Sequence, residues 1–206
     1  MRFRYLRWGA TDQEVGCSLP GDDLISNADM VATRAIAIRA SPDRVWPWIA
    51  QLGQGRGGFH SYDWLENLVG CNIHSSNRIL PEWQDITVGD EIRLAPQVGL
   101  AVAVVEQGRS LALRGGIPMG KRAAPYDFTW AFTIREEPDE TTRLLVRERY
   151  VYTQAWARLI VEPTELLSFA MTQKMLRGIR DRAERTAAAM SEGSGARNAL
   201  KAIQPS

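Results

Sequence analysis

The fold of this chain is decided by the stretch Ser41–Gly70, which reads SPDRVWPWIAQLGQGRGGFHSYDWLENLVG. Ser41 is a good helix N-cap, and Pro42 fits the first helical position without losing a needed hydrogen bond. Apolar residues at helical spacing follow, and Gly53 is the natural end of that helix. A glycine-rich turn then leads to a second short helix, predicted over 62–68. The stretch therefore predicts two short helices joined by a glycine-rich turn.

Strands are predicted on both sides of this stretch. Alternating apolar and polar residues over 32–39 indicate a strand directly before it. From Val88 onward strands are predicted in five segments, which are 91–94, 100–106, 110–114, 126–135 and 141–152, and the alternation is strong over 126–135. Short links between successive segments favour antiparallel pairing. A long helix with one apolar side is then predicted from Pro163 to about Met190.

This order of elements predicts an α+β fold with a curved antiparallel β-sheet. One face of such a sheet must be covered, and the long C-terminal helix is the predicted element able to do it. A sheet curved around a helix leaves a concave, mostly apolar hollow, which is a common kind of ligand site. We expect an N-terminal arm over 1–30, a ligand-binding domain over 31–190 and a disordered tail over 191–206.

Composition is typical of a single globular domain. The chain has 206 residues, of which 45% are hydrophobic and 24% charged. Its net charge of +1 gives no basic field, so no nucleic-acid partner is expected. The apolar run 98–105 is far shorter than the roughly 20 residues that span a bilayer, which predicts no integral membrane association. The N-terminus lacks the apolar region of a secretory signal, and a cytoplasmic location is expected. Cys17 and Cys71 fit no metal or redox spacing and are expected to be reduced thiols.

Several motifs together resemble the helix-grip superfamily that includes START domains, the birch pollen allergen and polyketide cyclases, often called SRPBCC. The residues that carry the resemblance are TRAIAIRASPDRVWPWIAQLGQGRGGFHSYDWLENLVG (33–70), Pro81-Glu82, Val88-Gly89-Asp90, Thr142–Arg147 and Met175–Glu184. They are most similar to a mostly uncharacterised bacterial branch, and the resemblance covers about 10–186. It implies a helix-grip fold, in which two short helices follow the first strand. Members of the superfamily bind lipids, hormones or polyketides, and only some catalyse. His60 departs from that branch, which more often has tyrosine there.

The turn and second helix carry the candidate polar site residues. Arg56 is a candidate for holding an anionic head group, and His60 or Tyr62 for donating or accepting a proton. The alternative for Arg56 is an ion pair with Asp63 or Glu66 that fixes the turn.

The expected cavity wall is apolar. Phe128, Trp130 and Phe132 share one face of a predicted strand, while Met171 and Met175 lie one turn apart on the covering helix. The proposed ligand-binding residues are Trp46, Arg56, His60, Tyr62, Phe128, Trp130, Phe132, Met171 and Met175.

The strand 141–152 has two possible orientations. Arg143, Arg147 and Arg149 share one of its faces, which would be either a basic cavity wall or a solvated outer face. We favour the outer face, because charged residues are seldom fully buried without partners.

No cofactor is predicted. The sequence GQGRGG follows a helix and does not match a phosphate-binding loop. The two histidines belong to no metal-binding motif, and no GxSxG nucleophile motif occurs.

Three hypotheses for function remain open. The first is binding or carriage of a small hydrophobic molecule with a polar end. The second is a polyketide cyclase or dehydratase that uses His60 or Tyr62 as acid and base and Arg56 as an anion clamp. The third is a regulatory or stress-response interaction module with the loop 115–125 as its partner surface. The sequence does not indicate an oligomeric state.

Overall fold

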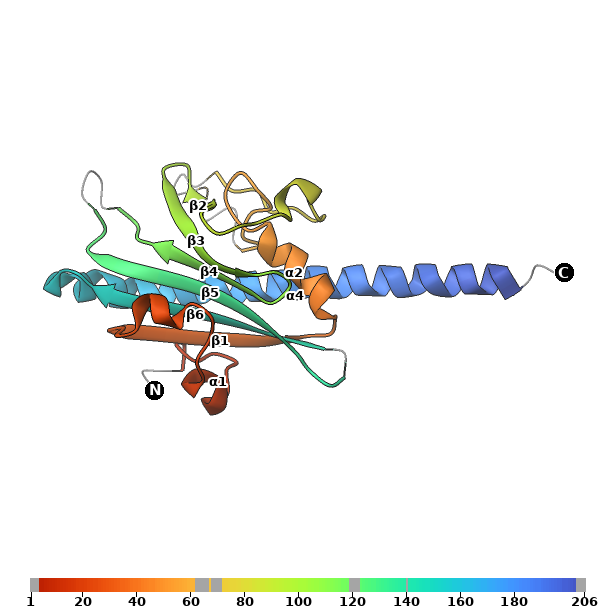
Figure 1. The fold of residues 1–206 in the computed structure, drawn as a ribbon, viewed down its shortest axis with the longest axis horizontal. Helices are drawn as coiled ribbons and strands as arrows, with labels where there is room; N and C mark the ends of the chain where they lie inside the picture. The colour runs from red at the N-terminus through yellow and green to blue at the C-terminus, as the bar shows by residue number, and fades with distance from the viewer. Residues whose placement is uncertain (1–3, 62–66, 68–71, 119–122, 140, 203–206) are drawn as a thin grey trace.

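The computed structural model describes residues 4–61, 67, 72–118, 123–139 and 141–202. Its centre is a six-stranded antiparallel sheet with the strand order β1-β6-β5-β4-β3-β2 (Figure 1). The strands are β1 Met30–Ile38, β2 Glu91–Ala95, β3 Val98–Glu106, β4 Ser110–Gly115, β5 Tyr126–Glu136 and β6 Thr142–Tyr152. Each strand predicted from the sequence is present, and its ends differ by at most two residues.

The helices complete the predicted α+β class. Helix α2, Pro42–Ala50, follows β1, and Pro42 occupies its first turn as predicted. A second short helix was predicted over 62–68. Within this range the structure describes only Asn67, and that residue is helical. The long helix α4, Arg158–Ala202, covers one face of the sheet (Figure 1). The remaining short elements are α1 Asp12–Gly16, η1 Asp22–Ile25, η2 Pro81–Trp83 and η3 Ala155–Ala157.

Helix α4 is longer than predicted at both ends. It begins at Arg158, so Pro163 lies inside it, although a proline without an amide hydrogen is more typical of a helix start. It also continues through Ala202, so 191–202, which we expected to be disordered, is helical. Good helix formers in that segment, Ala, Arg, Leu and Lys, outweigh its two glycines. Figure 1 shows this part of α4 projecting beyond the sheet.

The two faces of the sheet are covered by different parts of the chain. Alternate residues of β6 point to opposite faces, so Val146 and Arg147 lie on different sides. On the inner side, Val146 belongs to the main core, which also contains residues of α2 and α4 such as Trp48 and Ile179. On the outer side, Leu145 packs with Leu19 of the N-terminal arm. The sheet is therefore enclosed between α4 and the arm.

Arg147 joins the arm to the outer face. Its side chain is 3% exposed, and its guanidinium donates to the carbonyls of Glu14, Val15 and Cys17 and to the carboxylate of Asp22. The arginines of β6 therefore lie on the outer face, as we favoured, but the arm covers them in place of solvent.

The arm also runs along β1. The backbone N–H of Thr33 donates to the carbonyl of Leu6 at 2.8 Å, and that of Ala35 donates to the carbonyl of Trp8 at 3.0 Å. Trp8 packs against the main core, and the guanidinium of Arg177 lies 5.5 Å from the centre of its ring. These contacts fix the first described residues against the domain.

Candidate functional site

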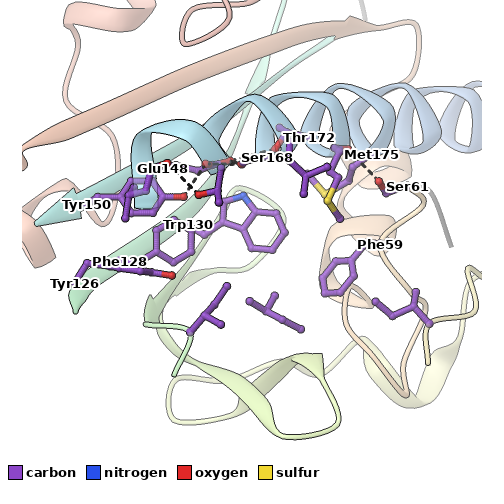
Figure 2. A pocket seen from close by; sticks show the side chains of 17 residues that line it. Phe59, Ser61, Tyr126, Phe128, Trp130, Glu148, Tyr150, Ser168, Thr172 and Met175 are labelled. Atoms are coloured by element: carbon purple, nitrogen blue, oxygen red, sulfur yellow. Dashed lines mark hydrogen bonds between the residues drawn. The ribbon is translucent and has the colours of Figure 1, made fainter. Parts of the chain in front are cut away.

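A cavity of about 320 Å³ lies between the sheet and α4 (Figure 2). Its wall is mostly apolar and comes from β2, β5, β6, α4 and the loops at one end of the sheet. The residues that line it are Phe59, Ser61, Ile73, Leu94, Ile117, Tyr126, Phe128, Trp130, Glu148, Tyr150, Val161, Thr164, Leu167, Ser168, Met171, Thr172 and Met175. Ile117 and Leu167 are 46% and 51% exposed, so they form an exposed rim of the cavity.

Strand pairing and helical spacing place these side chains together. Phe128 of β5 pairs with Tyr150 of β6, and their ring centres are 4.6 Å apart. From α4, lining residues recur every three or four positions from Val161 to Met175, which is the spacing of one helix face. The wall thus combines one face of two strands with one face of α4.

Two other hollows, of about 740 and 670 Å³, border the N-terminal arm. They are larger and more open to solvent. The first of them is lined in part by charged side chains, including Asp22, Arg147 and Arg149. Ligand pockets are usually concave and mostly apolar, so the cavity under α4 is the better candidate site.

A buried carboxylate, that of Glu148, forms the polar end of the cavity. Figure 2 shows the hydroxyls that surround it. Tyr150 and Ser168 donate to Oε2 at 3.2 and 3.0 Å, and Thr172 donates to Oε1 at 3.1 Å. Glu148 is only 2% exposed as a residue, so its charge depends on these partners and on Arg34.

Arg34 connects this carboxylate to a second one. Its Nη1 donates to Glu148 Oε1 at 2.9 Å, and its Nη2 donates to Glu165 of α4. The side chains of Arg34, Glu148 and Glu165 are 1–3% exposed. Two buried carboxylates therefore share one arginine between the sheet and α4.

Burial and the nearby charge of Glu148 raise the pKa values of Glu165 and Tyr150. Burial, followed by the charge of Glu148, raises the pKa of Glu165 from 4.5 to about 7, while Arg34 opposes this rise. Burial and the charge of Glu148 also raise the pKa of the Tyr150 hydroxyl well above its ordinary range. Tyr150 therefore stays protonated and acts as a donor to Glu148.

We expect stability to fall as the pH rises from about 5 to 8. In this range folded Glu165, with a pKa of about 7, holds a proton that the unfolded carboxyl, with a pKa near 4.5, has released. Unfolding then releases a proton, so a rising pH favours the unfolded chain, with a total effect on the order of 3 kcal/mol. Urea unfolding at both pH values measures the effect in the natural protein and in Glu165→Gln, which should show a smaller fall. Equal falls in the two proteins would contradict the assignment to Glu165.

The structure places the predicted site residues in two groups. Phe128, Trp130, Met171 and Met175 line the cavity. Trp46 and Phe132 are buried in the main core and are not among the lining residues. Phe132 differs because β5 continues past the cavity into solid core, and Trp46 lies on α2, which contributes no lining residue.

Arg56 fixes the turn that contains it. Its guanidinium donates to the carbonyls of Ala50 and Trp83 at 2.8 and 3.3 Å, and it stacks over the Trp83 ring at 4.6 Å. Burial lowers the pKa of Arg56, and Asp90 partly offsets this. Arg56 is not among the residues that line the cavity. These contacts are structural, which is one of the two roles that the sequence left open for Arg56. The partners are carbonyls and an aromatic ring. Asp63 and Glu66, the acids suggested as its partners, lie outside the described residues.

His60 lies where the turn meets α4. It is 2% exposed, and its ring packs edge-on against Trp48 with centres 5.6 Å apart. Its backbone has a φ of 56°, and a Cβ on Gly178 would lie 2.3 Å from its carbonyl oxygen. His60 therefore marks a close approach of turn and helix, and it is not a lining residue. Tyr62 lies outside the described residues.

Sequence reasoning missed the buried charges. Arg34 shares a strand face with Ile36 and Ile38, and Glu148 shares one with Val146 and Tyr150. A charged residue on an otherwise apolar strand face is a signal for a buried pair, because such residues are almost never fully buried alone. The period of two could have identified both residues as candidates.

Within the described part of the chain, no group of three or more His, Cys, Asp or Glu side chains is placed to hold a metal ion. No helix there is long and apolar enough to cross a membrane.

No family model matches the chain. No curated protein sequence matches it either. Among solved structures it is similar to the hypothetical protein jhp0584 from Helicobacter pylori, with 10% identity over 82% of this chain and 96% of that one and a TM-score of 0.48. It is also similar to a protein from Arthrobacter aurescens, with 12% identity, coverage of 78% and 92%, and a TM-score of 0.45. It is also similar to CalU16 from Micromonospora echinospora, with 16% identity over 77% of this chain and 86% of that one and a TM-score of 0.37. The α+β class rests on the sheet and helices of this chain, with which a helix-grip fold is compatible.

Proposed function

We propose that this protein binds and carries a small apolar molecule with one polar end in the cavity under α4. The observation that supports this most strongly is the cavity itself, which is mostly apolar, has an exposed rim and measures about 320 Å³. That volume lies at the lower end of the range of small-molecule sites. Met171 and Met175 in its wall suit ligands of varied shape, because methionine side chains are flexible and polarisable.

Catalysis of the cyclase or dehydratase type is not part of this proposal. Its assigned groups were His60 or Tyr62 as acid and base and Arg56 as an anion clamp. Among the described residues, neither His60 nor Arg56 lines the cavity. A proton-transferring group must come within hydrogen-bond reach of its substrate, so these two side chains give the enzyme hypothesis no support.

The proposal is tested with the neutral fluorescent probe N-phenyl-1-naphthylamine. We expect the protein to bind it and Met171→Trp to weaken binding at least tenfold, because the larger side chain occupies the cavity. Leu166→Trp is the matched control, since Leu166 lies on the same helix, is 59% exposed and is not a lining residue. A natural protein that takes up no probe, or a Met171→Trp variant that binds as well as Leu166→Trp, would refute the proposal.

A further inference from the structure

The hydroxyls around Glu148 donate their protons inside the protein and offer only lone pairs to a ligand, which restricts the kind of ligand that fits there. Six hydroxyls line the cavity, and all but that of Tyr126 have their protons committed inside the protein. Tyr150, Ser168 and Thr172 donate to Glu148. Ser61 donates to the carbonyl of Met171, and Thr164 donates to the carbonyls of Ile160 and Val161. A hydroxyl has one proton and two lone pairs, so these groups have lone pairs left for a ligand.

The charge of this end is unfavourable to anions. Arg34 provides one positive charge against the two carboxylates Glu148 and Glu165. Arg34 is itself 1% exposed, and none of the described lining residues carries a positive charge. A carboxylate ligand would enter a site of low dielectric next to Glu148 without a cation to pair with, which is costly.

A buried donor in the cavity wall, the indole of Trp130, is left without a hydrogen-bond partner in the described part of the chain. The indole Nε1 of Trp130 is buried and has no hydrogen-bond acceptor among the described residues. In Figure 2 the nitrogen edge of this ring is turned toward α4. A ligand hydroxyl can accept from such a donor while it donates to the lone pairs at the polar end.

We propose that the molecule held in this cavity has a hydrogen-bond donor and no negative charge at the end that meets Glu148, as in a long-chain alcohol. The inference rests on the proposed binding function and adds the chemical class of the ligand. It also excludes the anionic head group that Arg56 suggested, because Arg56 lies outside the wall. The ligand's apolar part lies among the aromatic and methionine side chains, and its donor points between β6 and α4.

Displacement of bound N-phenyl-1-naphthylamine by three ligands of one chain length tests the inference. At pH 8 we expect decan-1-ol and decylammonium to displace the probe at concentrations at least tenfold lower than decanoate. Displacement by decanoate at equal or lower concentrations would overturn the inference while leaving the binding function intact. Failure of the probe to bind would instead refute the binding function, so the two failures are distinguishable.

A single substitution tests whether the polar end of the cavity causes the preference for decan-1-ol over decanoate. Ser168→Ala removes one hydrogen-bond acceptor for the ligand hydroxyl and should reduce the preference for decan-1-ol over decanoate several-fold. Thr186→Ala is the matched control, because Thr186 is a hydroxyl residue of α4 that donates within its helix and is not a lining residue. An equal preference in the Ser168→Ala variant and the natural protein would overturn the assignment. Unfolding curves of both variants check that the fold is retained.

Discussion

Replacing Arg34 with methionine is expected to lower the free energy of unfolding by about 3–5 kcal/mol. Methionine fills much of the same space but leaves Glu148 and Glu165 facing each other without a cation. Both side chains are nearly inaccessible to water, with exposed fractions of 3% and 1%, so water cannot replace the lost partner. Urea unfolding at pH 7 measures the change.

Two further variants make this result specific. Arg114→Met is the matched control, because Arg114 pairs with Asp127 while its side chain is 46% exposed, and exposed pairs contribute about 1 kcal/mol or less. Adding Glu148→Gln and Glu165→Gln to Arg34→Met removes both carboxylate charges and should recover part of the loss. A loss below that of Arg114→Met would show that the buried network is not what holds β1, β6 and α4 together.

Replacing Arg147 with methionine is expected to cost about 3 kcal/mol and to release the N-terminal arm. The guanidinium donates to carbonyls of the arm and to Asp22, and it also donates to Thr33 Oγ1 at 3.0 Å. Without it, several buried acceptors lose their hydrogen bonds, which costs about 1–3 kcal/mol for each group that stays unsatisfied. Unfolding curves measure the stability, and limited proteolysis measures the exposure of the arm.

The matched control for this prediction is Arg109→Met. The side chain of Arg109 is 77% exposed, and its nearest acidic partner, Glu106, is 4.0 Å away. It should change neither stability nor cleavage. If Arg147→Met were cleaved in the arm no faster than Arg109→Met, the arm would be held by contacts other than this arginine.

The sequence was sufficient to predict the six strands and helix α2. The period of two in 126–135 and 141–152 predicted β5 and β6, and the capping signals at Ser41 and Pro42 predicted α2. Local pattern determines these features, because half-buried strands and helix starts leave local signatures. The aromatic wall followed from the same pattern, since Phe128 and Trp130 share a strand face.

The polar end of the cavity could not be predicted from local sequence pattern, because its residues come from distant parts of the chain. Arg34 and Glu148 are separated by 114 positions and meet only because β1 pairs with β6. Glu165 joins them from a helix whose start lay earlier than Pro163 indicated. The cover over Arg147 was equally inaccessible, because 1–30 lacks clean periodicity. The sequence shows that Arg34 and Glu148 are charged residues on apolar strand faces. It does not show that β1 pairs with β6, which is what brings the two residues together.

The hydrogen bonds between the arm and β1 have a consequence for how the protein behaves in a crowded solution. In the strand order, β1 is a terminal strand, and such strands carry unpaired N–H and C=O groups that can template pairing with another molecule. The carbonyls of Leu6 and Trp8 occupy the N–H groups of Thr33 and Ala35 on that side. We infer that the arm protects this sheet edge against aggregation, and a chain that lacks both Leu6 and Trp8 would expose these N–H groups to pairing with another molecule.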